Sequence, residues 1–227
     1  MHIPDLKGVR KASENLRDVS IITPLNLNER LSEKLNARIF FKREDLQKVR
    51  SFKIRGAFNK IKSLNLQDTQ HRKRIICASA GNHAQGVAYS CNKLKIFGTI
   101  YMPETTPKQK VERVKMFGGD FIEIILVGDT FDDAQKEAKK QLNNDSVFIH
   151  PFDDKEVIEG QGTVALEILD QIDKHFDYLI IPIGGGGLIA GIISVFKELS
   201  PKTKIIGVEA QGAPAMSDSL KPNKIIE

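Results

Sequence analysis

The residue whose type and setting most directly suggest chemistry is Lys53, which follows Phe52. A lysine amine is a nucleophile only when it is deprotonated, and nearby cations and a helix N-terminus both disfavour its ammonium form. Lys48, Arg50 and Arg55 are close in sequence, and a helix-favouring segment follows. Phe52 offers an apolar face against which a planar ring could pack. Most lysines are solvated, so Lys53 alone does not establish a site.

A second feature is a run of four glycines, Gly184, Gly185, Gly186 and Gly187, followed by Leu188. The run lies between an apolar strand-like segment and an apolar helix-like segment. Each glycine costs roughly 0.5–1 kcal/mol of backbone entropy, so an ordinary turn would not favour four of them. Without side chains, successive N–H groups can surround a phosphate dianion at a helix N-terminus. Close packing of the helix on the strand is the structural alternative.

A dinucleotide site is a further alternative for this glycine run. Such a site favours Gly-x-Gly-x-x-Gly and an acidic residue about 20 residues later, and Glu209 is at a tolerable distance. The run comes late in the chain, however, and a dinucleotide site would not explain Lys53.

The third feature is the loop that contains Ser79, Gly81, Asn82 and His83. It lies between a predicted strand and a predicted helix, so its exposed amides suit a carboxylate ligand. Asn82 could cap the helix and also reach a ligand. Taken alone, the loop is typical of the capped start of a helix. A lone histidine such as His83 is more often structural than catalytic.

The elements that must position these residues alternate regularly between strand and helix. In residues 82–94 the apolar positions recur with the 3.6-residue period of a helix. Thr106 is expected to cap the next helix, with Pro107 at its first position. Such alternation indicates parallel sheets covered on both faces, and the short chain favours two sheets over one. The predicted strands are 38–42, 75–78, 96–102, 121–127, 147–150, 178–183 and 204–209, and the predicted helices are 5–16, 54–64, 82–94, 106–118, 130–142, 156–172 and 188–199.

Composition excludes several other classes of protein. The net charge of +5 is spread along the chain, and its tightest basic cluster, residues 71–74, has no interleaved aromatic residues. A nucleic-acid partner is therefore not expected. Neither a leader peptide nor an apolar run of the ~20 residues that span a bilayer is evident. Cys77 and Cys91 do not have metal-ligand spacing, and a reducing cytoplasm is the expected compartment.

The end of the sequence also carries an expectation. A helix-like stretch reaches Leu220, and residues 224–227 then begin what reads as another strand. Because domains rarely end where an element begins, we expect the chain to be a fragment of a longer protein, unless it is a natural short form or a pseudogene product.

Together, in this order and spacing, the motifs resemble the fold-type II pyridoxal-phosphate enzymes, and most closely the threonine dehydratases. The resemblance rests on Lys42-Arg43-Glu44-Asp45, Ser51 to Ala57, Ser79 to Gly86, Gly160-Gln161-Gly162-Thr163 and Gly184 to Leu188. It covers nearly the whole chain. The form Lys-Arg-Glu-Asp-Leu-Gln before Lys53 resembles the biosynthetic branch of the dehydratases more than the catabolic branch.

This resemblance implies an α/β fold with two doubly wound αβα domains. Residues 1–70 and 151–227 would form the larger domain, incomplete at its C-terminus, and residues 71–150 the smaller one. The cofactor, pyridoxal 5'-phosphate, would lie in the cleft between them. The implied reaction is β-elimination and deamination of L-threonine to 2-oxobutanoate and ammonia, the first step of isoleucine biosynthesis. The full-length protein is expected to be a cytoplasmic homo-oligomer.

The resemblance also assigns roles to residues. Lys53 would bind the cofactor covalently and then act as the base at the substrate α-carbon, and Phe52 would pack beside the cofactor ring. Asn82 would hydrogen-bond the ring hydroxyl. The substrate carboxylate would be bound by Ser79, Gly81, Asn82 and His83. The phosphate would be bound by Gly184, Gly185, Gly186, Gly187 and Leu188.

Two departures from the family pattern refine this interpretation. Serine racemases of the family have a serine before the Gly-Asn pair as a second acid/base, and Ala80 in that position favours elimination over racemisation. They also carry an acidic cation ligand where Ala215 stands, so no divalent metal site is expected. The family's partner for the ring nitrogen would follow Glu227, so weak cofactor binding and low turnover are expected for this chain. Serine dehydratase, a related β-eliminating enzyme and a catalytically dead remnant remain the alternatives.

Overall fold

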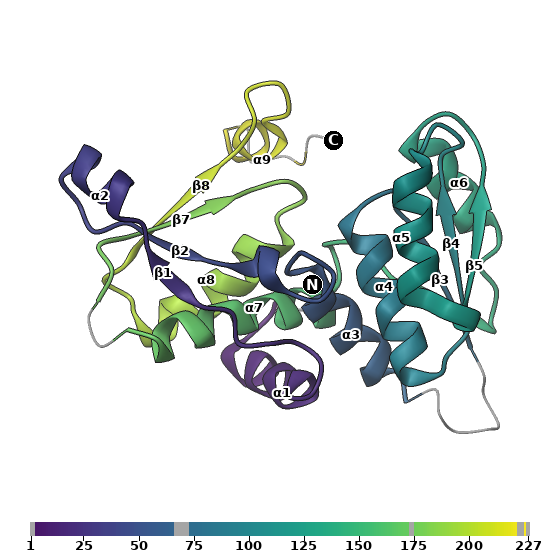
Figure 1. The fold of residues 1–227 in the computed structure, drawn as a ribbon, viewed down its shortest axis with the longest axis horizontal. Helices are drawn as coiled ribbons and strands as arrows, with labels where there is room; N and C mark the ends of the chain where they lie inside the picture. The colour runs from purple at the N-terminus through teal and green to yellow at the C-terminus, as the bar shows by residue number, and fades with distance from the viewer. Residues whose placement is uncertain (1–2, 66–72, 173–174, 222–224, 226–227) are drawn as a thin grey trace.

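The computed structural model describes residues 3–65, 73–172, 175–221 and 225. The expected domain boundary near residue 70 and the expected strand at 224–227 fall on residues outside or at the edge of these ranges. The ribbon has two lobes, and α3 lies where they meet (Figure 1). Lys53 is the first residue of that helix.

One lobe is built on a four-stranded parallel sheet with the strand order β5-β4-β3-β6. Its strands are β3 (Arg74–Ala78), β4 (Gly98–Met102), β5 (Ile122–Leu126) and β6 (Ser146–Phe148). The helices between them are α4 (Asn82–Leu94), α5 (Lys108–Gly118) and α6 (Phe131–Lys140), and a 3-10 turn, η2 (Gly119–Phe121), precedes β5.

Alternating residues of this sheet enter two separate hydrophobic clusters. Ile75 and Cys77 of β3 join a cluster with residues of α4 and α5. Ile76 and Ala78 point to the opposite face and join a cluster with Ala134 and Ala138 of α6. Because side chains alternate across a strand, both faces of the sheet are buried, as expected for a doubly wound parallel sheet.

The other lobe contains a two-stranded parallel sheet, β7 (Tyr178–Pro182) and β8 (Lys204–Val208). One face packs on α8 (Gly187–Leu199), through a cluster that includes Ile181, Ile192 and Phe196. The long helix α7 (Lys155–Asp170) packs between α8 and α3 (Lys53–Ser63), and α1 (Leu6–Leu16) packs against α7.

The contact between α7 and α3 explains part of the Gly-Gln-Gly-Thr motif. A Cβ at Gly160 would lie 2.6 Å from the Cα of Gly56, far inside van der Waals contact. A glycine at this position therefore lets the two helix backbones approach closely. The motif holds the helix that begins with Lys53 against the body of the lobe.

Some elements were missed by the sequence analysis or differ from it. Strand β1 (Leu25–Leu27), which pairs antiparallel with β2 (Phe40–Lys42), was not predicted, because its three mostly exposed residues give no periodic signal. Strand β2 lies within the predicted strand 38–42. The remaining short elements are α2 (Glu29–Leu35), the 3-10 turn η1 (Glu44–Leu46) and α9 (Ala215–Leu220).

The predicted cap of α5 was wrong. The helix begins one residue later than expected, with Pro107 as its N-cap, and the buried Thr106 hydroxyl has no hydrogen-bond partner among the described residues. Thr106 therefore lies one residue before the N-cap and does not cap the helix. No helix in residues 3–65, 73–172 and 175–221 is long and apolar enough to span a membrane.

Candidate functional site

Lys53 occupies the start of α3, and its side chain is largely withdrawn from solvent. Its Nζ donates a 2.6 Å hydrogen bond to the carbonyl oxygen of Pro151 and lies 5.5 Å from the centre of the Phe52 ring. Burial lowers the pKa of Lys53 to about 8. A substantial fraction of the amine is therefore neutral in mildly alkaline solution, as a nucleophile requires.

The cause of this pKa shift differs from the expected one. Neighbouring cations were expected to lower the pKa of Lys53, but burial alone accounts for the shift. Lys48 lies beside the Tyr89 ring and donates to its hydroxyl at 3.1 Å. Arg55 forms ion pairs with Glu44 and Glu167, and these carboxylates neutralise its charge.

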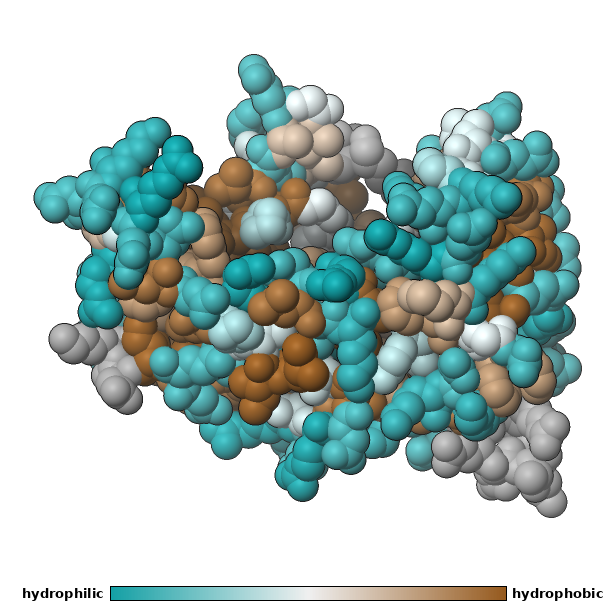
Figure 2. Space-filling view, in the orientation of Figure 1, coloured by the Kyte–Doolittle hydropathy of each residue, from teal (hydrophilic) through white to brown (hydrophobic). Residues whose placement is uncertain are grey.

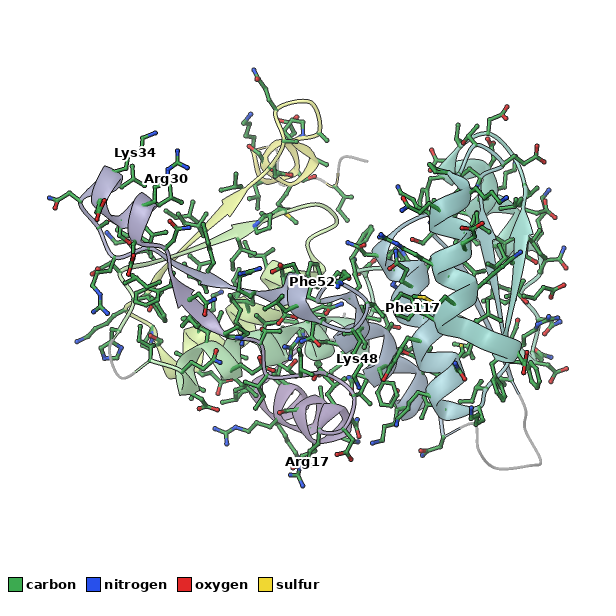
Figure 3. All side chains as sticks on the ribbon, viewed as in Figure 1. Arg17, Arg30, Lys34, Lys48, Phe52 and Phe117 are labelled. Carbon is green, nitrogen blue, oxygen red and sulfur yellow. The ribbon has the colours of Figure 1, made fainter. Side chains whose placement is uncertain are left out.

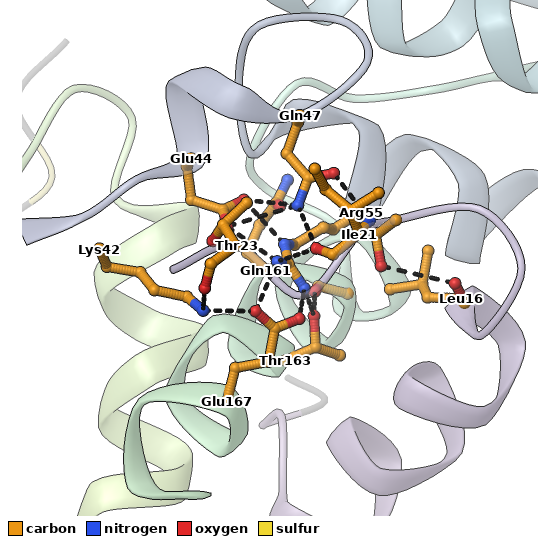
Figure 4. A network of polar contacts seen from close by, with 12 residues as sticks. Leu16, Ile21, Thr23, Lys42, Glu44, Gln47, Arg55, Gln161, Thr163 and Glu167 are labelled. Atoms are coloured by element: carbon orange, nitrogen blue, oxygen red, sulfur yellow. Dashed lines mark hydrogen bonds and ion pairs between the residues drawn. The ribbon is translucent and has the colours of Figure 1, made fainter. Parts of the chain in front are cut away.

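Figure 4 shows the polar network that anchors α3 two residues after Lys53. Arg55 is 1% exposed and forms ion pairs with Glu44 at 2.8 Å and Glu167 at 2.6 Å. Lys42 pairs with the second oxygen of Glu167, also at 2.6 Å. Two cations and two anions balance in charge, and additional hydrogen bonds, including one from Arg55 to Thr163, satisfy the buried groups.

This network accounts for the Lys-Arg-Glu-Asp motif that contributed to the family resemblance. Lys42 and Glu44 point inward to the network, whereas Arg43 and Asp45 form an exposed pair with each other. Glu167 was not predicted as a member of this network. Lys42 and Arg55 are 125 and 112 residues away from it, and no local pattern links them.

Phe52 lies at the N-terminal end of α3, where the two lobes meet (Figure 3). Its ring is half-buried and packs against the hydrophobic cluster of α7, α8 and β7. One edge of the ring is therefore fixed, and the side chain stands next to the amine of Lys53.

The loop after β3 places its residues in different environments. Ser79 is half-buried, and its Oγ accepts a 3.2 Å hydrogen bond from the amide of Gly81. Asn82 is exposed and is the first residue of α4. The predicted cap by Asn82 was wrong, because Gly81 is the N-cap residue and no side chain caps this helix. The Asn82 side chain is therefore not committed to a helix cap.

His83 is buried beneath this loop. Its Nε2 lies 3.0 Å from the carbonyl oxygen of Ile149. Because a carbonyl can only accept, Nε2 carries the proton, and Nδ1 is an acceptor. Nδ1 is buried and has no partner among the described residues. Burial lowers the pKa of His83 to about 3, so the ring is neutral at ordinary pH.

The four glycines, Gly184 to Gly187, form a loop between β7 and α8, which we call the glycine loop. Gly186 has a left-handed backbone with φ of 85°, and Gly187 is the first residue of α8. A Cβ at Gly185 would lie 2.2 Å from the Phe152 ring, whereas a Cβ at Gly184 would meet no heavy atom within 4 Å. Close packing thus explains some of the glycines but not Gly184, which faces open space.

Leu188 follows the glycine loop in α8 and packs partly against the hydrophobic cluster of that lobe. The structure brings the loop close to Lys53 through one shared segment, because Lys53 contacts Pro151 and the glycine loop contacts Phe152. His83 contacts Ile149 of the same segment. The three motifs therefore converge around residues 149–152.

The alternatives to a phosphate site have less support. The Glu209 carboxylate accepts hydrogen bonds from the amides of Met216 at 2.9 Å and Ser217 at 2.8 Å. It is thus occupied in holding the start of α9 rather than free to bind a ribose. No group of three or more His, Cys, Asp or Glu residues within the described ranges could hold a metal ion.

These features bring a buried lysine amine, an aromatic ring and a glycine loop to one segment of the chain, on an α/β fold with two parallel sheets. Residues 17–227 match the family described as pyridoxal-phosphate dependent enzymes, and the chain belongs to this family. The cofactor of the family is pyridoxal 5'-phosphate.

Among its relatives, the chain is similar to the biosynthetic L-threonine dehydratase IlvA of Halalkalibacterium halodurans, with 54% identity over 217 residues. That match covers 95% of this chain and 52% of the relative, so the chain spans about half the length of the curated relatives it matches.

Solved structures of related enzymes are also similar to this chain. The processed form of threonine deaminase isoform 2 from Solanum lycopersicum superposes with a TM-score of 0.88 and 43% identity, over 99% of this chain and 62% of that one. Maize serine racemase superposes with a TM-score of 0.90 and 35% identity, over 99% of this chain and 67% of that one. The predicted α/β fold of the fold-type II kind is confirmed.

The residues present fit the cofactor of this family. A partly buried amine, a half-buried aromatic ring beside it and a glycine loop with one open side are the groups that an aldehyde, a pyridine ring and a phosphate each require. The unpartnered Nδ1 of His83 adds a buried acceptor near Lys53.

Proposed function

We propose that the protein acts in the pyridoxal-phosphate-dependent β-elimination and deamination of L-threonine, which yields 2-oxobutanoate and ammonia in the first step of isoleucine biosynthesis. The observation that carries this proposal is the convergence of Lys53 and the glycine loop on residues 149–152. The identity to biosynthetic threonine dehydratases supports the choice of threonine.

In this proposal, the glycine loop and the amide of Leu188 bind the cofactor phosphate at the start of α8. This arrangement is favourable because the N–H groups of a helix N-terminus are unpaired and the helix dipole favours an anion. Phe52 packs beside the cofactor ring, and Asn82, which is free of any capping role, hydrogen-bonds the ring hydroxyl.

The substrate carboxylate would lie at the loop after β3. The amides of Ser79, Gly81, Asn82 and His83 are close to the N-terminus of α4, where an anion is again favoured. A neutral His83 suits this site, because its ring is held by Ile149 and does not itself titrate near neutral pH.

Lys53 would hold the cofactor and then take the α-proton of the substrate. Its partly buried position keeps the amine weakly basic, with a pKa of about 8, so it can accept and return a proton near physiological pH. The cofactor supplies the electron sink that stabilises the carbanion. Loss of the β-hydroxyl follows.

We also propose the division of the chain into residues 1–70 with 151–227 and residues 71–150. The hydrophobic cluster around α8 comes entirely from the first set of residues and the cluster beneath α6 entirely from the second, which supports this division. For the whole protein we propose an amino-acid substrate and a homo-oligomer in the cytoplasm, where the free buried thiols of Cys77 and Cys91 would stay reduced.

The test is release of 2-oxobutanoate from L-threonine, with L-serine assayed in parallel. Borohydride should fix the cofactor to Lys53, and Lys53→Ala should abolish both the label and any turnover. The proposal fails if the label appears on another lysine, or if Lys53→Ala releases 2-oxobutanoate as the wild-type protein does.

Racemisation is the second candidate, because the fold also matches maize serine racemase. Ala80 carries no acid or base for the second face of the substrate, which favours elimination. Formation of D-serine from L-serine at a rate comparable to deamination would favour the racemase instead.

A further inference from the structure

The segment Ile149–Phe152 between β6 and α7, which we call the connector, contacts all three motifs of the site. The Ile149 carbonyl oxygen lies 3.0 Å from Nε2 of His83. The Pro151 carbonyl oxygen accepts from Nζ of Lys53 at 2.6 Å. The Phe152 ring packs against the glycine loop. The connector therefore sets the spacing between these parts of the site.

Phe152 fills one side of the glycine loop. A Cβ added at Gly185 would lie 2.2 Å from two atoms of the Phe152 ring, and a Cβ at Gly187 would lie 2.8 Å from the Phe152 carbonyl oxygen. The ring and backbone of Phe152 thus occupy the space next to the loop. A Cβ at Gly184 meets no heavy atom within 4 Å, so this part of the loop has room for a ligand.

Phe152 is itself held in place by the preceding histidine. The rings of His150 and Phe152 are 4.6 Å apart at 85°, an edge-to-face arrangement. Nδ1 of His150 accepts from the amides of Asp153 at 2.8 Å and Phe152 at 3.4 Å. The turn therefore fixes the direction in which the Phe152 side chain points.

We propose that Phe152 is a positioning residue that holds the glycine loop in the conformation that binds the cofactor phosphate, at a fixed separation from Lys53. The inference rests on the proposed function, because it takes the phosphate of pyridoxal 5'-phosphate as the ligand of the loop. Phe152 does not need to touch the cofactor. Without the Phe152 ring, the glycine loop has no surface to pack against. It must then become ordered when the phosphate binds, and this ordering weakens binding.

Two probes distinguish a role in phosphate binding from a general loss of folded structure. Pyridoxal 5'-phosphate and pyridoxal both react with the amine of Lys53, but only the first carries a phosphate. Their affinities would be measured by absorption titration, and the covalent products would be fixed with borohydride and mapped to Lys53. We expect Phe152→Ala to weaken pyridoxal 5'-phosphate binding about tenfold while pyridoxal binding changes less than about twofold. Phe152→Leu should restore most of the loss.

A matched control comes from the other lobe. Phe117 is also half-buried, and it packs against α4 rather than against the glycine loop (Figure 3). Phe117→Ala should lower the stability of the protein but leave the ratio of the two affinities at the wild-type value. A change in this ratio for Phe117→Ala as large as that for Phe152→Ala would overturn the inference.

The inference and the proposed function fail in different ways. Equal losses for both probes in Phe152→Ala, or no loss for either, would refute the positioning role while leaving the proposed function intact. A wild-type protein that forms no adduct at Lys53 with either probe would refute the proposed function, and the positioning role with it.

Discussion

The two parallel sheets of the molecule are covered to different extents. In the four-stranded sheet, every residue of β4 and the last four residues of β3 are buried. In the two-stranded sheet, only Ile181 is buried, and one face presents apolar side chains to the surface. Figure 2 shows brown, hydrophobic surface in the region where Figure 1 draws β7 and β8. Both sheets nevertheless end in a loop that carries residues of the proposed site.

This difference shows that the two halves of the site are stabilised in different ways. The loop after β3 rests on a sheet with hydrophobic clusters on both faces. The glycine loop after β7 leads into α8, which packs on α7, and α7 packs on α3. The buried network around Arg55 joins α7 and α3. The stability of the second half should therefore depend more on helix packing and buried ion pairs than on its sheet.

The largest expected effect is the loss of this network. Arg55→Ala would leave Glu44 and Glu167 buried without their main partner, so we expect the free energy of unfolding to fall by about 3–5 kcal/mol. Urea denaturation followed by circular dichroism measures it. Arg43→Ala, which removes an exposed pair with Asp45, should leave the unfolding midpoint unchanged. Similar losses in both variants would show that the network does not anchor α3.

The second effect compares one isoleucine from each sheet. Ile100 in β4 is 0% exposed and Ile180 in β7 is 64% exposed. Ile100→Ala should cost about 2–4 kcal/mol through lost burial and a cavity, and Ile180→Ala less than about 0.5 kcal/mol. The same denaturation experiment measures both. A loss at Ile180 that approaches the loss at Ile100 would mean that the β7–β8 face is covered in solution.

The third effect is a pH dependence of the free energy of unfolding, which arises from the buried amine of Lys53. Its pKa is about 8 in the folded protein and 10.5 for an ordinary lysine. A lowered lysine pKa destabilises the folded state, fully below about pH 8, and this cost disappears as the pH rises towards 10.5. Lys53→Met should therefore stabilise the protein at pH 7, by at most about 3 kcal/mol for this difference in pKa, and by less because the hydrogen bond to Pro151 is lost. Unfolding curves at pH 7 and 10 test this.

A kinetic measurement checks the same pKa without unfolding the protein. The rate at which pyridoxal labels Lys53 should rise with pH and level off above about pH 8. His83 and His150 face this region, and burial lowers the pKa of both below the usual histidine value, so neither should add an inflection near pH 8. A labelling rate that continues to rise through pH 10 would show that Lys53 is an ordinary solvated lysine.

Much of this architecture could be predicted from the sequence, because its signals are local. The 3.6-residue period of α4 gave its bounds, Asn82–Leu94, and the alternation of strands and helices gave the parallel sheets. The lysine and glycine motifs indicated the cofactor, which the family match confirms. The features that could not be predicted depend on contacts between residues that are distant in the sequence.

Three examples show this limit. Glu167 and Arg55 are 112 residues apart, and neither residue type indicates a buried pair, since most such side chains are solvated. Phe152 was not identified because its role arises from the position of the glycine loop in space. The cap of α4 by Asn82 was wrong because Gly81 adopts the N-cap position instead. An ion pair between distant residues, a ring beside a loop and the residue that caps a helix all depend on how the chain packs.

The smallest effect on stability, and the most direct test of the comparison, concerns the exposed face of β7 and β8. Ile180 pairs with Ile206 across the two strands, and the two side chains are 64% and 42% exposed. Neighbouring apolar side chains on an exposed face form a patch of the kind that binds hydrophobic dyes. The double substitution Ile180→Ser and Ile206→Ser should therefore reduce the fluorescence of bound anilinonaphthalene sulfonate severalfold, while stability changes by less than about 0.5 kcal/mol. Met116→Ser, at a 66% exposed residue of α5, should leave the fluorescence nearly unchanged, and equal reductions in the two variants would remove the distinction between the sheets.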